Sequence, residues 1–233
     1  MGGSQGTTVP NASLRPMRVS EYELGLDLKL FHNRVSVDFA TYQKITNDQI
    51  VSAQVSDASG FITRLINSGK SQTRGFELLV NFVPFKTNKF QWDVTFNTSY
   101  NITKTLSIIT DDDGTPEKDY NKDGKPERIT IGTHVFNGEL RNVVGQELGQ
   151  IYGFGFKRND QGQMIFGPKG IPLRTDDLIS YGSALPKWIG GITNSFNYKG
   201  ISLSFLIDYK LGNMMLSGTN FNAVRHGLHQ MTL

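Results

Sequence analysis

Residues 188–209 read WIGGITNSFNYKGISLSFLIDY and contain two runs of alternating apolar and polar residues that meet at Lys199-Gly200. A period of two is that of a β-strand, whose successive side chains point to opposite faces. One face of the predicted hairpin is apolar and carries Trp188, Ile192, Phe196 and Tyr198 from the first run and Ile201, Leu203, Phe205, Ile207 and Tyr209 from the second. On the polar face of the second run, Leu206 is the single apolar residue. This alternation is compatible with a membrane barrel and with a soluble β-sandwich.

Two further hairpins have the same pattern. Strands are expected over residues 21–31 and 34–45, joined by a tight turn at His32-Asn33, because Asn tolerates positive φ. A second pair is expected over residues 74–85 and 90–103, joined by a turn across residues 84–89. The chain thus predicts six strands arranged as three hairpins.

The connections between these hairpins are long, covering residues 46–73 and 104–187, whereas the turns within them are short. Compact soluble domains rarely contain unstructured loops longer than about 15 residues. Transmembrane barrels, by contrast, join strands of about 10 residues with short turns at one membrane face and long loops at the other. Aromatic residues also lie near the strand ends, where interfacial girdles are expected: Tyr22, Trp92, Tyr100, Trp188, Tyr198 and Tyr209. The prediction is an all-β, antiparallel transmembrane barrel segment.

Composition is consistent with this prediction. Hydrophobic residues make up 37% of the chain and aromatic residues 11%, and no run of apolar residues is long enough for a spanning helix. The chain has no Cys, which excludes disulfide and thiolate chemistry, and a net charge of +3 spread along 233 residues gives no indication of nucleic-acid binding.

Three blocks of the sequence resemble the SusC/RagA family of TonB-dependent outer-membrane transporters. Residues 10–51 resemble the family's N-x-x-L-x-P entry, E-x-G-L-D strand, F-x-N-R turn and Y-x-K strand end. Residues 67–97 resemble its N-x-G-x-x-x-x-G-x-E strand and the F-x-W-x-V strand that follows. Residues 144–155 and 185–213 resemble its V-G-x-x-x-G-x-I-Y-G segment and P-K-W-x-G-G-x-x-N hairpin.

The resemblance implies a barrel of about 22 strands in the cell outer membrane. Residues 1–233 would then be a fragment of the barrel domain, with the plug domain and the remaining strands absent. The family role would be active import of nutrient glycans, oligosaccharides or oligopeptides with a SusD-like lipoprotein, energised by the TonB complex through parts outside this chain. The wall would contact outer-membrane lipid, the short turns would face the periplasm, and no cofactor would be required.

Aromatic residues of the second long connection are candidates for substrate binding, because their rings can stack on sugars or pack against a partner. These residues are Tyr120, Tyr152, Phe154, Phe156 and Tyr181. Ordinary packing within the loop, or a place in the interfacial girdle, is the alternative role for the same residues.

One acidic loop has the spacing of a calcium site. Asp119, Asn121 and Asp123 precede Gly124 as D-x-N-x-D-G, and Glu127 is a possible further ligand. Thr130 stands where such a loop usually has a bidentate Glu, so a solvated acidic loop is the alternative. Bound calcium would stiffen this extracellular loop.

The sequence indicates no enzyme, because none of its four histidines belongs to a recognisable catalytic set and no nucleophile or phosphate-binding motif occurs. Two alternatives to the importer are considered. A soluble, surface-exposed β-sandwich that binds carbohydrate would turn the apolar faces inward against each other. An outer-membrane hydrolase on a smaller barrel would need a Ser/His/acid set near its lumen or rim.

Overall fold

The computed structural model describes residues 8–54, 58, 60–108, 125–134 and 138–230 of the chain. All six predicted strands are present in one large sheet. Their bounds are β2 (Arg18–Leu30), β3 (Val35–Gln54), β4 (Thr63–Lys86), β5 (Phe90–Ser107), β10 (Trp188–Tyr198) and β11 (Ile201–Leu211). They pair antiparallel in the order β11-β10-β5-β4-β3-β2, and the short β1 (Thr8–Val9) adds parallel to the start of β4.

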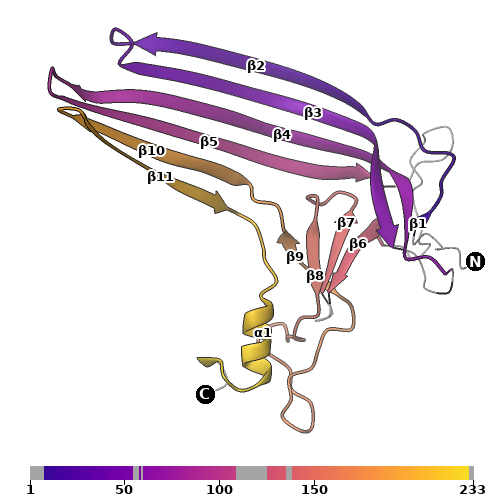
Figure 1. Cartoon of the computed structure of the whole chain (residues 1–233). Helices are drawn as coiled ribbons and strands as arrows, with labels where there is room; N and C mark the ends of the chain where they lie inside the picture. Colours follow the sequence, from indigo (N-terminus) through magenta and orange to yellow (C-terminus); the bar gives the residue numbers. More distant parts are fainter. Residues whose placement is uncertain (1–7, 55–57, 59, 109–124, 135–137, 231–233) are drawn as a thin grey trace, which may run out of the picture.

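The three tight turns lie together at one end of the large sheet (Figure 1). Asn33 has the expected positive φ, 64°, and its neighbours Phe31 and His32 also have positive φ, 53° and 56°. Lys199 and Gly200 both have positive φ, 47° and 89°, as a two-residue turn that matches the strand twist requires. The remaining turn is shorter than predicted, because β4 continues past Pro84 to Lys86.

The long connections differ from the prediction, which treated them as loops without regular structure. Residues 46–54 and 63–73 continue β3 and β4, and their pairing extends to Gln54 opposite Thr63. The connection after β5 contains a second sheet, β6 (Arg128–His134), β7 (Gly138–Val143), β8 (Gln150–Gly153) and β9 (Ile179–Ser183). The segment after β11 contains a helix, α1 (Gly218–Arg225), whose N-cap Ser217 accepts a hydrogen bond from the Asn220 amide.

Strand register aligns the apolar residues of the large sheet into rows that cross all six strands. One row consists of directly opposed residues from β2, β3, β4, β5, β10 and β11: Leu28, Val37, Val80, Phe96, Ile192 and Ile207. The adjacent row on the opposite face is mostly polar: Asp27, Asp38, Leu79, Asn97, Gly191 and Asp208. The sheet therefore has one apolar and one polar face over its full width, as a barrel wall requires.

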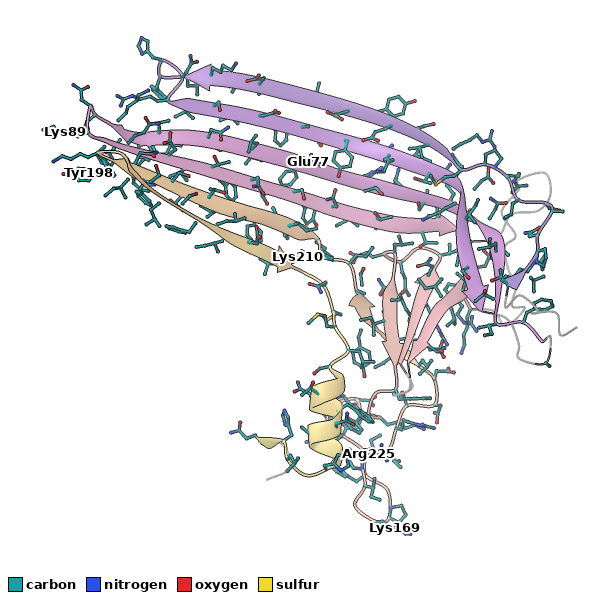
Figure 2. All side chains as sticks on the ribbon, viewed as in Figure 1. Glu77, Lys89, Lys169, Tyr198, Lys210 and Arg225 are labelled. Carbon is teal, nitrogen blue, oxygen red and sulfur yellow. The ribbon has the colours of Figure 1, made fainter. Side chains whose placement is uncertain are left out.

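Nothing in the described part of the chain packs against this apolar face. Leu24 and Ile201 each keep 73% of their surface exposed, and Leu203 keeps 62%. Side chains project freely from both faces of the sheet in Figure 2. A soluble sandwich would have covered these residues with a second sheet, whereas an apolar face this large is suited to lipid.

Two aromatic clusters bound the apolar face. At the turn end Trp92 stacks on Phe85 and Phe196, with ring centroids 6.2 and 5.5 Å away. At the other end Trp188 contacts Phe76 and Tyr100 at 5.6 and 4.7 Å. Trp92 and Tyr100 are eight residues apart on β5, about 27 Å along the strand and about 21 Å in height for a tilt of about 40°. This is close to the apolar band of about 25 Å in outer-membrane barrels.

The small sheet β6-β7-β8-β9 is attached at the end of the large sheet that lies opposite the tight turns. The chain between β7 and β8 extends the pairing of β5, since the Thr105 amide donates to the Gln146 carbonyl (3.0 Å) and the Leu148 amide to the Thr103 carbonyl (2.8 Å). The best-buried apolar residues of the described chain, Ile108 (0% exposed) and Val143 (2%), lie at this junction. The core thus holds the small sheet to the wall.

No helix in the described part of the chain is long and apolar enough to cross a bilayer.

Candidate functional site

Side-chain hydrogen bonds hold the small sheet and its turns in place. Asn142 accepts a bond from the Gly149 amide (3.1 Å), and Gln150 donates to the Glu147 carbonyl (2.9 Å) and accepts from the Ser180 hydroxyl (2.6 Å). The Ser183 hydroxyl donates to the Leu148 carbonyl (2.6 Å). Asn142, Gln150 and Ser183 are all buried. This network gives the adjoining aromatic residues a fixed support.

An aromatic groove of about 440 Å³ opens between the small sheet and the chain around α1. Three of the five aromatic candidates line it, Tyr152 and Phe154 at the end of β8 and Tyr181 on β9. The Tyr181 hydroxyl donates to the Phe154 carbonyl at 2.9 Å, and the Arg174 guanidinium lies 3.9 Å from the centre of the Phe154 ring. The other lining residues are Gly138, Ile151, Gly153, Met214, Met215, Leu216 and Phe221.

A polar groove of about 320 Å³ lies on the other side of Tyr152 and Phe154, which line both grooves. Its charged residues are Lys125, Arg128, Arg141, Asp176 and Asp177. Lys125 pairs with Asp177 at 2.9 Å, and Arg141 lies 5.0 Å from the centre of the Tyr152 ring. A ligand that reached both grooves would contact aromatic faces in one and charges of both signs in the other.

The carboxylate of Glu139 holds Arg141, one of the cations of the polar groove. It accepts bonds from Arg141 Nε (2.7 Å) and the Thr130 hydroxyl (3.0 Å). Burial raises the pKa of Glu139, but these hydrogen bonds and the charges of Arg141 and Arg128 outweigh burial and lower the pKa below its ordinary value. Glu139 therefore stays ionised and fixes Arg141 beside Tyr152.

The remaining predicted site residues are not part of these grooves. Phe156 is 56% exposed and its backbone bridges to Arg174. Tyr120, Asp119, Asn121 and Asp123 lie outside the described residues, and Glu127 is buried beside the small sheet. Within residues 8–54, 60–108, 125–134 and 138–230 no cluster of three metal-binding side chains occurs. The calcium site stays a prediction.

Sequence reasoning missed Arg174, Met214 and Phe221, which come from segments distant along the chain. The one local signal was the apolar run Met214 to Leu216 just before the helix-capping Ser217. The charged residues of the polar groove gave no signal, because they are spread along the connection between β5 and β10 without a recognisable motif.

Comparison with known proteins agrees with the architecture. Residues 1–222 match the family model described as TonB dependent receptor-like, beta-barrel. A TonB-dependent receptor of Formosa agariphila is 27% identical over 237 residues, covering 87% of this chain and 23% of the relative. The TonB-dependent receptor SusC of Bacteroides thetaiotaomicron is 24% identical over 217 residues, covering 87% of this chain and 20% of SusC.

Among solved structures, the RagAB peptide transporter has the same fold over 84% of this chain and 21% of the matched chain, with a TM-score of 0.61 and 18% identity. The RagAB peptide importer in its open-open state aligns over 89% and 22%, with a TM-score of 0.60 and 17% identity. The chain spans about a fifth of the length of the relatives it matches.

Proposed function

Because this chain belongs to the TonB dependent receptor-like β-barrel family, we propose that it forms part of the wall of an outer-membrane, TonB-dependent importer. The observation that carries the proposal is the row of apolar residues that crosses all six strands, such as Leu28 on β2 and Ile207 on β11, while the three tight turns share one end. Such a wall is suited to lipid on one face and to a wet lumen on the other.

In the proposed orientation the tight turns face the periplasm, and the small sheet and α1 face the outside. Figure 2 labels Lys89 and Tyr198 near the turns and Lys169 and Arg225 at the far extremity of the molecule. Short periplasmic turns and longer external loops are the rule for these barrels. The aromatic and polar grooves would then meet arriving ligand before it enters the lumen.

We further propose that the ligand is a nutrient glycan or an oligopeptide, and that a SusD-like lipoprotein covers the external face. The aromatic groove supports this class of ligand, because Tyr152, Phe154 and Tyr181 offer ring surfaces for sugars or apolar side chains. The TonB complex would act through parts of the protein outside this chain.

The first test is the location of the full-length protein. The proposal expects it in the outer-membrane fraction, running faster on a denaturing gel before boiling than after, because a closed barrel resists unfolding. A soluble protein without a heat shift would contradict the proposal and favour a surface carbohydrate-binding module.

The second test concerns the groove. A ligand is first identified by thermal-shift screening of oligosaccharides and oligopeptides. The double variant Tyr152→Ala, Tyr181→Ala should then weaken binding and uptake of this ligand roughly 3- to 10-fold, as expected for lost aromatic contacts. Phe156→Ala is the matched control, because this ring is exposed outside the groove. An equal effect of the control would contradict the assignment of the groove.

A further inference from the structure

Two cations stand on the lipid-facing side of the wall, just beyond the upper aromatic cluster of Phe76, Tyr100 and Trp188. Arg74 on β4 has the same strand parity as Phe76, and Lys104 on β5 the same parity as Tyr100. Register places Arg74 opposite Ile102 and Gln72 opposite Lys104. These side chains therefore continue the apolar face upward, where it becomes charged.

The cations line a groove of about 430 Å³, here called the rim groove. Its lining residues are Gln72, Arg74, Gly75, Phe76, Tyr100, Ile102 and Lys104. Its lower part is thus apolar and aromatic, and its upper part is cationic. A ligand that fits this order has an apolar body and an anionic head.

The height of the rim groove matches the headgroup layer of a bilayer. Arg74 is two residues above Phe76, about 5 Å in height for a tilted strand, and Lys104 is four residues above Tyr100, about 10 Å. Headgroups occupy about 5 to 8 Å beyond the hydrocarbon on each side. Since aromatic girdles mark the hydrocarbon boundary, the two cations bracket the level of lipid phosphates.

The charges of Arg74 and Lys104 are not neutralised within the described part of the chain. Arg74 Nε donates to Gln43 Oε1 (2.8 Å), which holds the guanidinium in place. On the side away from Gln72, Lys104 forms an isolated backbone bridge with Glu147, but that carboxylate pairs with Lys187 at 2.7 Å. No carboxylate among the described residues pairs with Arg74 or Lys104.

We propose that the rim groove binds the phosphate of an anionic membrane lipid. The Arg74 guanidinium and the Lys104 ammonium contact the phosphate oxygens, and the acyl chains lie along Phe76, Tyr100 and Ile102. The inference rests on the proposed function for one point, that this end of the wall faces the outer leaflet. The site would anchor the wall at a fixed depth beside the external loops.

The test uses the full-length protein in detergent, with dioleoylphosphatidic acid as the probe and native mass spectrometry to count retained lipid. The wild type should retain the probe, and the Arg74→Gln, Lys104→Gln double variant should bind it roughly 30-fold more weakly, as expected for two interfacial cations. The matched control is Lys44→Gln with Lys210→Gln, which removes two charges from the polar face and should leave retention unchanged.

Three results would overturn the inference: equal retention in the rim-groove variant, an equal loss in the control, or inorganic phosphate binding as tightly as the lipid. A heat-shifted band confirms that each variant is folded. Lipid retention is measured without transport, so the two proposals can fail separately. If the protein retains the lipid but does not import ligand, only the proposed function is contradicted. If it imports ligand but does not retain the lipid, only the rim groove is contradicted.

Discussion

The hydroxyl of Tyr209 on β11 donates a hydrogen bond of 2.6 Å to Oγ1 of Thr98 on β5, across the intervening strand β10. The bond is possible because Gly190 stands between them in the register and leaves room for the tyrosine ring. Thr98 is only 8% exposed beneath it. On the polar face the Tyr42 hydroxyl reaches Asn101 across Gly75 in the same way. Rings laid over glycines thus tie together strands that are not neighbours.

Replacing Tyr209 by Phe keeps the ring over Gly190 but removes its hydrogen bond to Thr98. The Thr98 hydroxyl would then be covered on a lipid-facing surface without this partner, which costs roughly 1 kcal/mol. We expect a lower midpoint for loss of the folded, heat-shifted band on heating. An unchanged midpoint would show that another acceptor or donor replaces Tyr209.

Adding a methyl group at Gly190 should be more damaging. An ideal Cβ there would overlap the carbonyl oxygen of Asn97 and lie 2.6 Å from the Tyr209 hydroxyl oxygen. We expect Gly190→Ala to displace the ring, separate β10 from β5 locally and reduce the yield of assembled barrel. Gly25→Ala is the control, since its Cβ would meet only the Phe39 carbonyl oxygen at an ordinary 3.7 Å. Similar yields for both variants would contradict this account.

The two faces of the wall predict opposite responses to charge at adjacent positions. Val80 lies in the central apolar row, and Leu79, 38% exposed, is its neighbour on the polar face. Val80→Arg should destabilise the barrel by about 2–4 kcal/mol and prevent membrane assembly, because the charge would sit near the bilayer midplane. Leu79→Arg makes the same change in a wet lumen and should assemble. Assembly of both variants, measured by outer-membrane fractionation, would contradict the barrel.

The hairpins could be predicted from the sequence because each strand carries its own alternating pattern on a scale of about ten residues. The extensions of β3 and β4 could not, because residues 46–54 are mostly polar without alternation. Their pairing is supported by side-chain bonds that include the segment before β2: Asn67 on β4 donates to the carbonyls of Arg15 and of Asp48 on β3, both at 2.9 Å. The contacts of the preceding segment, not a local pattern, continue these strands.

The site was only partly predictable for a related reason. Aromatic residues are few enough that Tyr152, Phe154 and Tyr181 could be selected by type, and the structure brings these three to one groove. Arg174 and Phe221 share that groove only because the segment before β9 and the helix α1 line the same space as the end of β8. The short strands of the small sheet, such as the four residues of β8, contain too few positions for a period to be recognised.

A nearly buried carboxylate pins the amino-terminal segment to the wall. Asp48, with a side chain 9% exposed, pairs with Arg15 at 3.0 Å and Arg18 at 3.2 Å. Asp48→Asn keeps the shape but removes the charge, so residues 8–18 should open more often. We expect trypsin to cleave after Arg18 about tenfold faster, measured by mass spectrometry of the released peptide, since Pro16 blocks cleavage after Arg15. Asp176→Asn, which removes an exposed partner of Lys157, should leave this cleavage rate unchanged.

The small sheet should lose stability in acid through Glu139. The pKa of Glu139 is lowered in the folded state, below the ordinary value of 4.5. The ionised carboxylate therefore stabilises the fold at pH values above the unfolded-state pKa. This contribution disappears as the pH falls through the folded-state pKa. Glu139→Gln lacks this titration. Wild type should therefore melt higher than Glu139→Gln at about pH 6, and the two should converge at about pH 3. The difference should stay within about 1 kcal/mol, because the Arg141 and Glu139 side chains are partly exposed. A gap between the two proteins that is the same at both pH values would mean that Glu139 acts through its shape and hydrogen bonds and not through its charge.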